Sequence, residues 1–130
     1  MTRIATTLFL FALLYSCSDT GYHQGRSLYD SKCANCHMED GSGLKGLIPP
    51  LAGTDFLMEH RADIPCYIRY GMSAPLLVNG ERYTQQVMPA IPSLSEVEIT
   101  NISNYILTAW GNKGEVLKLE DVKKRLEGCE

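Results

Sequence analysis

A five-residue run, Cys33-Ala34-Asn35-Cys36-His37, constrains this chain of 130 residues more than any other feature. Two cysteines with two residues between them lie within one helical turn, so both thiols can reach the same edge of a planar group. The histidine that follows can then place its imidazole on one face of that group. Covalent haem attachment needs this order, because each thiol adds to one vinyl group and the histidine ligates the iron. The run therefore predicts one haem c, attached through Cys33 and Cys36 and ligated by His37.

Two other kinds of site also use a Cys-x-x-Cys pair. A structural zinc site needs two further Cys or His ligands at a matching spacing, and a thioredoxin-like redox site needs a βαβ pattern around it. The sequence contains neither pattern. Haem attachment is therefore the favoured interpretation of the run.

The first sixteen residues are typical of an export signal. Arg3 precedes an uncharged, mostly apolar run of twelve residues, 4–15, which is too short to cross a bilayer as a mature helix. The run ends in Leu14-Tyr15-Ser16-Cys17, which resembles a bacterial lipobox. We therefore expect residues 1–16 to be a lipoprotein-type signal peptide, Cys17 to receive the lipid, and residues 17–24 to form a polar tether. The alternative is an ordinary secretory signal followed by a chance cysteine. Both place the protein in the cell envelope, on the periplasmic side, and the first adds a membrane anchor.

The remaining two cysteines form an even pair. With Cys17 assigned to a lipid and two cysteines to haem, Cys66 and Cys129 are left over. In an oxidising compartment a disulfide between them is the natural hypothesis, and it would join the end of the chain to the domain. Such a bond needs Cα atoms within about 7 Å of each other, which the sequence does not determine.

The pattern of apolar residues and helix-ending residues predicts an all-α domain over residues 25–112, followed by a helical tail over 113–130. The best-defined helix lies between a capping box, Ser95 to Glu98, and Gly111. A small hairpin is expected around Asn79-Gly80, within residues 76–85. Other helices are expected from Gly25 into the Cys33–His37 run, from Thr54-Asp55 to about His60, from Pro65 to Gly71, and, more weakly, over 116–126.

The charge balance restricts the kinds of partner. Residues 17–130 hold 11 basic and 15 acidic residues, and the tail, 113–130, has five of each. The acidic excess therefore lies in the domain, which argues against a nucleic-acid partner. Lys45 is the only lysine between Cys36 and Met88, so a ring of lysines cannot steer acidic partners toward the haem. We expect docking through an apolar patch or with basic partners.

Several further patterns resemble those of the class I cytochromes c. Gly25 and Tyr29 precede Cys33 by eight and four residues, where this family has a glycine and an aromatic residue on its N-terminal helix. Ile102 and Tyr105 match the family's positions on the C-terminal helix that crosses it. The similarity covers residues 25–112 and is greatest to small, membrane-tethered bacterial members. It implies a cytochrome c fold in which the two helices cross beside the haem.

The resemblance also implies the remaining site residues. Pro50-Leu51-Ala52-Gly53 is similar to the loop whose proline carbonyl accepts a hydrogen bond from the proximal histidine, which assigns that role to Pro50. Val87–Ala90 is similar to the loop that carries the distal methionine, which makes Met88 the second axial ligand. A His/Met pair fills both axial positions and suits electron transfer. Other candidates for the second position are Met72, Met58, His60 and His23, whereas Met38 is too close to His37 to reach the opposite face.

These residues predict a monohaem electron carrier with no small-molecule substrate and no catalytic residues. Its expected partners are redox proteins: a dehydrogenase, a quinol-oxidising complex or a terminal oxidase. Two alternatives remain open. One is a gas-binding or sensory haem protein, which requires Met88 to be absent from the iron or easily displaced. The other is a haem subunit of a larger oxidoreductase, with residues 116–126 as a docking element.

Overall fold

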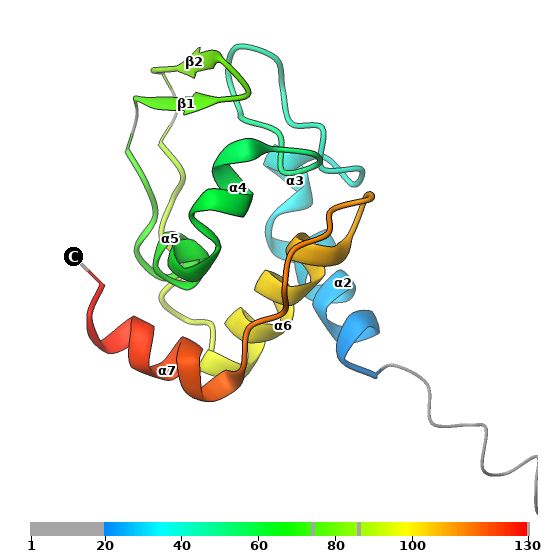
Figure 1. Ribbon diagram of the computed structural model, residues 1–130, viewed down its shortest axis with the longest axis vertical. Helices are drawn as coiled ribbons and strands as arrows, with labels where there is room; N and C mark the ends of the chain where they lie inside the picture. The colour runs from blue at the N-terminus through cyan, green and yellow to red at the C-terminus, as the bar shows by residue number, and fades with distance from the viewer. Residues whose placement is uncertain (1–19, 74, 86, 130) are drawn as a thin grey trace, which may run out of the picture.

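The computed structural model describes residues 20–73, 75–85 and 87–129, and Cys17 and the predicted signal peptide lie outside them. Helices surround a central space, and one antiparallel hairpin closes it at one end (Figure 1). The structure is therefore mostly helical, as predicted. Its helices are α2 (Thr20–Lys32), α3 (Ala34–His37), α4 (Asp55–Glu59), the 3-10 helix η1 (Arg61–Asp63), α5 (Ile64–Tyr70), α6 (Glu96–Thr108) and α7 (Leu119–Glu127), and its strands are β1 (Leu76–Val78) and β2 (Glu81–Tyr83).

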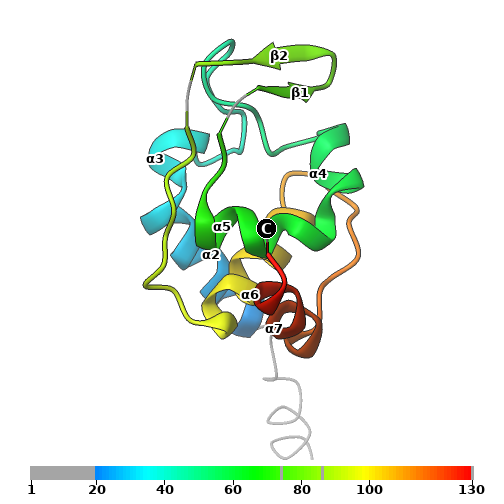
Figure 2. The ribbon, with the colours of Figure 1, turned by 90° about the vertical axis from the view of Figure 1, so that its left-hand side faces the viewer.

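The first and last helices of the domain, α2 and α6, cross in close contact (Figures 1 and 2). At the crossing a Cβ on Gly25 would lie 2.3 Å from the carbonyl oxygen of Asn101, so a larger residue cannot fit without displacing a helix. Tyr29 is fully buried, and its ring centroid lies 5.3 Å from that of Tyr105. The helix crossing expected from the resemblance is thus present.

Helix α6 begins at the predicted capping box. The Ser95 hydroxyl accepts a hydrogen bond from the backbone N–H of Glu98, and the Glu98 carboxylate accepts one from the backbone N–H of Ser95. Ile99, Ile102 and Leu107 from this helix are completely buried in the core. The helix ends at Thr108, three residues before the glycine expected to stop it.

Two turn signals also act as predicted. Pro65 lies in the first turn of α5, and Gly71 ends that helix with φ of 77°. Asn79 and Gly80, with φ of 49° and 79°, form the two-residue turn between β1 and β2, which pair Leu76 with Tyr83 and Val78 with Glu81. Positive φ at both turn positions is what a two-residue hairpin requires, and Asn-Gly supplies it.

The N-terminal boundary differs from the prediction. Helix α2 already includes Thr20, so residues 20–24 of the expected tether are helical, and the helix begins before Gly25. Polar residues do not by themselves break a helix, and this first turn has a tertiary contact. The Gln24 side chain accepts a hydrogen bond of 2.8 Å from the amide of Asn101 on α6. Polar composition therefore did not predict where this helix begins.

The C-terminal tail packs against α5 and α6 through α7. Val122 is buried, and Arg125 Nε lies 2.8 Å from Asp63 Oδ1. Helix α7 begins at Leu119, not at residue 116 as predicted. The reason is that the Asn104 side chain bonds both backbone groups of Leu117, at 2.7 and 3.0 Å, and holds it outside the helix. Within the described ranges no helix is long and apolar enough to cross a membrane.

Candidate functional site

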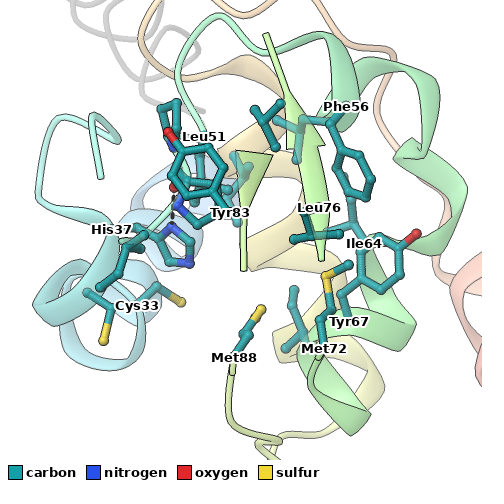
Figure 3. Close-up of a pocket in the computed structure, with 18 of the residues that line it drawn as sticks. Cys33, His37, Leu51, Phe56, Ile64, Tyr67, Met72, Leu76, Tyr83 and Met88 are labelled. Atoms are coloured by element: carbon teal, nitrogen blue, oxygen red, sulfur yellow. Dashed lines mark hydrogen bonds between the residues drawn. The ribbon is translucent and has the colours of Figure 1, made fainter. Parts of the chain in front are cut away.

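A mostly apolar cavity lies between the Cys33–His37 segment, α5, the hairpin and the loop that carries Met88 (Figure 3). Cys33, Cys36, His37 and Met88 all line it, although Met88 is more than fifty residues from the others in sequence. The structure thus brings the four predicted haem-binding residues together. The apolar side chains of its wall include Ile48, Leu51, Phe56, Ile64, Ile68, Leu76, Val78 and Ile106.

His37 points its imidazole into the cavity (Figure 3). Its Nδ1 lies 3.1 Å from the carbonyl oxygen of Pro49, so the proton is on Nδ1 and the lone pair of Nε2 is left for a ligand. Burial lowers the pKa of His37, while the Pro49 carbonyl partly opposes this shift. The ring is therefore neutral at neutral pH, the form that binds a metal.

The acceptor for His37 is Pro49, not Pro50 as the resemblance implied. Successive carbonyls of an extended segment point in different directions, so only one of two adjacent prolines can face the ring. Pro50 still lines the cavity. The sequence could not decide between the two, because both lack an N–H and both follow the same loop.

Met88 lies across the cavity from His37, with its sulfur directed inward (Figure 3). An isolated antiparallel bridge to Met72 holds it, with N···O distances of 3.0 and 2.9 Å. The neighbouring Ile91 donates its backbone N–H to the carbonyl of Ile68 on α5, at 3.0 Å. This loop is thus fixed to the segment that ends α5.

The two thiols of the attachment run lie in different environments. Cys33 is buried and Cys36 is exposed, and neither is in a disulfide. Burial, with a smaller contribution from Cys36, raises the pKa of Cys33 to about 11. Reactive redox cysteines need the opposite shift, toward the thiolate at neutral pH. The Cys33 thiol is therefore not activated for thioredoxin-like chemistry.

The other candidates for the second axial ligand lie at different positions relative to the cavity. Met72 lines the cavity beside Met88 and lies on the same side of it (Figure 3). Met58 packs against the hydrophobic core, and His60 ends α4 with its ring 4.4 Å from that of Phe56. Among the described residues, His37 is the one histidine in the cavity wall. Cys66 and Cys129 lie away from the cavity and are joined, with an S–S distance of 2.05 Å and Cα atoms 5.6 Å apart.

The donor set fits haem c: two free thiols, an imidazole with a free Nε2 and a thioether face one apolar cavity. Residues 22–110 match the family model described as cytochrome c. The chain belongs to the cytochrome c family. It is accordingly an electron-carrying c-type cytochrome with covalently bound haem c.

Relatives of this cytochrome include proteins named simply as cytochromes and cytochrome subunits of dehydrogenases. Cytochrome c-552 of Thermus thermophilus is 34% identical over 109 residues, which cover 77% of this chain and 82% of that protein. The cytochrome c subunit of the quinone alcohol dehydrogenase of Gluconacetobacter polyoxogenes is 31% identical over 119 residues, which cover 85% of this chain but 25% of that subunit. The fructose dehydrogenase cytochrome subunit of Gluconobacter japonicus is 30% identical, with coverage of 77% and 21%.

Proposed function

We propose that Cys33 and Cys36 form the thioether bonds to a single haem c and that His37 Nε2 and Met88 Sδ are the axial ligands of its iron. The protein would carry single electrons in a bacterial envelope. The observation that carries this proposal is the position of the His37 ring and the Met88 sulfur on opposite sides of one cavity (Figure 3), whose wall also contains Cys33 and Cys36.

Each residue has a defined part in this function. When bound, haem supplies an iron that gains and loses one electron. The Pro49 carbonyl holds the Nδ1 proton of His37 and makes its Nε2 a better donor. The Met88 thioether favours the reduced iron relative to harder ligands. Two protein ligands leave no position open for a gas, which favours an electron carrier over a sensor.

The proposed partners are redox proteins that dock at the rim of the cavity. Leu47 and Val87 line the cavity and are 43% and 64% exposed, so part of the rim is apolar. Lys45 is the only lysine between Cys36 and Met88, so strong steering toward acidic partners is not expected. Similarity to cytochrome subunits of alcohol and fructose dehydrogenases supports a sugar or alcohol dehydrogenase as electron donor, or a role as part of such a complex.

We also propose that residues 1–16 direct export and that Cys17 is lipidated, which would keep the carrier on a membrane surface. The sequence pattern Leu14–Cys17 supports this proposal. Metabolic labelling with a radioactive fatty acid checks it, with Cys17→Ser as the unlabelled control. Label retained in that variant would contradict the anchor.

Optical spectra of the purified holoprotein test the haem assignment. Pyridine haemochrome analysis should give one haem c per chain, and Cys33→Ala with Cys36→Ala should abolish covalent attachment. Met88→Ala should remove the methionine-to-ferric-iron charge-transfer band and allow carbon monoxide to bind the reduced protein, because the iron loses its sixth ligand.

Met72→Ala is the matched control, since Met72 lines the same cavity and its backbone bridge to Met88 does not depend on its side chain. It should keep the charge-transfer band. Loss of the band in Met72→Ala and its retention in Met88→Ala would reverse the assignment. Ready binding of carbon monoxide by the unaltered protein would favour the sensor.

A further inference from the structure

The loop that follows the two prolines is bonded to a distant side chain, Asn112, just beyond the end of α6. Asn112 Oδ1 accepts a hydrogen bond of 2.8 Å from the backbone N–H of Gly53. Its Nδ2 donates to the carbonyl of Leu51 at 3.0 Å and to the carbonyl of Ile106 at 2.8 Å. Three bonds from one amide thus join the loop to the C-terminal turn of α6.

Only an amide of this size can make this set of bonds, because it needs one acceptor and two donors on one short side chain. Ile106 is among the last four residues of α6, whose carbonyls have no partner within the helix. Asn112 satisfies that carbonyl and the loop together. Neither the attachment run nor the apolar pattern of α6 pointed to this residue.

The bonded loop is directly connected to the acceptor of His37. Pro49 and Pro50 have no N–H, so this pair cannot anchor itself by donating backbone hydrogen bonds. The carbonyl direction of Pro49 therefore depends on its neighbours on either side. Before the pair, Leu44 and Ile48 bond each other at 2.9 and 2.8 Å. After it, Leu51 is bonded through its N–H to Gly41 at 2.7 Å and through its carbonyl to Asn112.

We propose that Asn112 is a positioning residue for the proximal ligand: through Leu51 it holds the Pro49 carbonyl against Nδ1 of His37. This inference rests on the proposed function of His37 as the iron ligand. Asn112 itself is absent from the cavity wall, so it acts on the site through its bonds to Leu51 and Ile106, which line the cavity.

The proposal predicts the sign of an electronic effect. A hydrogen bond from Nδ1–H to a carbonyl increases the electron donation of the imidazole and stabilises the ferric iron. If Asn112 is removed, Leu51 loses one of its two anchors and the Pro49 carbonyl is held less firmly. The reduction potential should therefore rise, and the Nδ1–H proton of His37 should exchange with solvent faster.

The experiment compares Asn112→Ala and Asn112→Asp with Asn104→Ala in the haem-loaded protein. Asn104 is the matched control, because it also bridges α6 to a backbone segment, but that segment is Leu117 in the tail. NMR of the reduced protein gives the exchange rate of the His37 Nδ1–H proton. Loss of the hydrogen bond to the Leu51 carbonyl, which both Asn112 variants lack, should accelerate exchange about threefold to tenfold.

Asn112→Asp is nearly isosteric and keeps the acceptor for Gly53, but it loses both donors. Asn112→Asp therefore shows the effect of losing the two donors without a loss of side-chain volume. If Asn112→Ala does not accumulate, the measurements on Asn112→Asp alone test the proposal. The inference is supported if both measured variants, or Asn112→Asp alone, show faster exchange and a higher potential while Asn104→Ala matches the unaltered protein.

The inference is overturned if exchange and potential in the Asn112 variants equal those of the unaltered protein, or if Asn104→Ala changes them equally. Failure of the proposed function would give a result that is distinguishable from failure of this inference. In that case the unaltered protein would lack covalent haem, or its His37 resonances would show no contact with the iron.

Discussion

Two structural features require a glycine at position 71: the backbone conformation that ends α5 and the close approach of the Met88 loop. Its φ of 77° ends α5, as the sequence predicts for a glycine there. The structure adds that a Cβ on Gly71 would lie 2.4 Å from the carbonyl oxygen of Met88 and 2.9 Å from the N of Ala90. The close approach of the Met88 loop to the end of α5 therefore depends on the missing side chain.

Gly71→Ala is predicted to weaken the proposed bond between the haem iron and Met88 as well as the fold. With φ of 77° and ψ of −177°, Gly71 has a backbone conformation that is essentially restricted to glycine, so strain costs roughly 1–3 kcal/mol, and displacement of the Met88 loop adds roughly 1–3 kcal/mol. Denaturant unfolding measures the sum, and the charge-transfer band reports on Met88. Gly80→Ala is the matched control, since Gly80 has φ of 79° but nothing within 4 Å of an added Cβ. Equal losses in both variants, with the band intact, would refute the contact with the Met88 loop.

At the same scale, the sequence predicted residues that line the cavity better than it predicted the hydrogen bonds behind them. Cys33, Cys36 and His37 are neighbours, so their spacing alone predicts what they do together. The choice of Pro49 over Pro50 and the bonds of Asn112 depend on how distant segments meet. No local spacing encodes those contacts.

Among the elements, those with local signals were the predictable ones. The signals are the capping box of α6, the Asn-Gly turn and Pro65 in the first turn of α5, and each involves residues within one turn of each other. The predicted start of α7 was wrong because a side chain of α6 competes with the helix: Asn104 bonds both backbone groups of Leu117. The predicted start of α2 was also wrong, since that helix already includes Thr20. Propensity is a weak signal where a tertiary hydrogen bond competes with it.

The capping box predicts a pH dependence that belongs to α6. The N–H and the hydroxyl of Ser95 donate to the Glu98 carboxylate and, with a smaller effect of Lys32, hold the pKa of Glu98 below its usual range. The unfolded chain thus binds a proton here at higher pH than the folded one. This stabilisation is complete above the usual glutamate pKa of about 4.3 and is lost as the pH falls through the lower folded-state value.

Glu98→Gln should therefore give a flatter decline of the free energy of unfolding with acid, measured by denaturant titration between about pH 6 and about pH 3. Glu96→Gln is the control, because it removes a carboxylate from the same helical turn but leaves the box in place. A slope in Glu98→Gln as steep as in the unaltered protein would show that the box does not contribute.

Across the whole molecule, the tail closes the fold on the side of α5 away from the cavity. Helix α7 contacts α5, α6 and η1, and the disulfide joins Cys66 on α5 to Cys129, 63 residues later (Figures 1 and 2). The haem attachment run and the disulfide thus restrain different parts of the chain. The bonds that hold the Met88 loop, from Met72 and Ile68, do not involve α7.

Removal of the disulfide should therefore lower stability without changing the haem. In the chain-entropy description, closing a loop of this length contributes about 4 kcal/mol, so Cys66→Ala with Cys129→Ser should lose about 2–4 kcal/mol of unfolding free energy. The optical spectrum and the charge-transfer band should be unchanged at 25 °C.

Treating the unaltered protein with dithiothreitol should give the same loss of unfolding free energy, because a thiol reduces a disulfide but does not cleave a thioether. Lys123→Ala, on the exposed face of α7, controls for substitution in this helix. Unchanged unfolding free energy in both the double variant and the reduced protein would mean that packing of α7, without the disulfide, stabilises this part of the fold. Loss of the charge-transfer band would mean that the disulfide or α7 also stabilises the position of Met88.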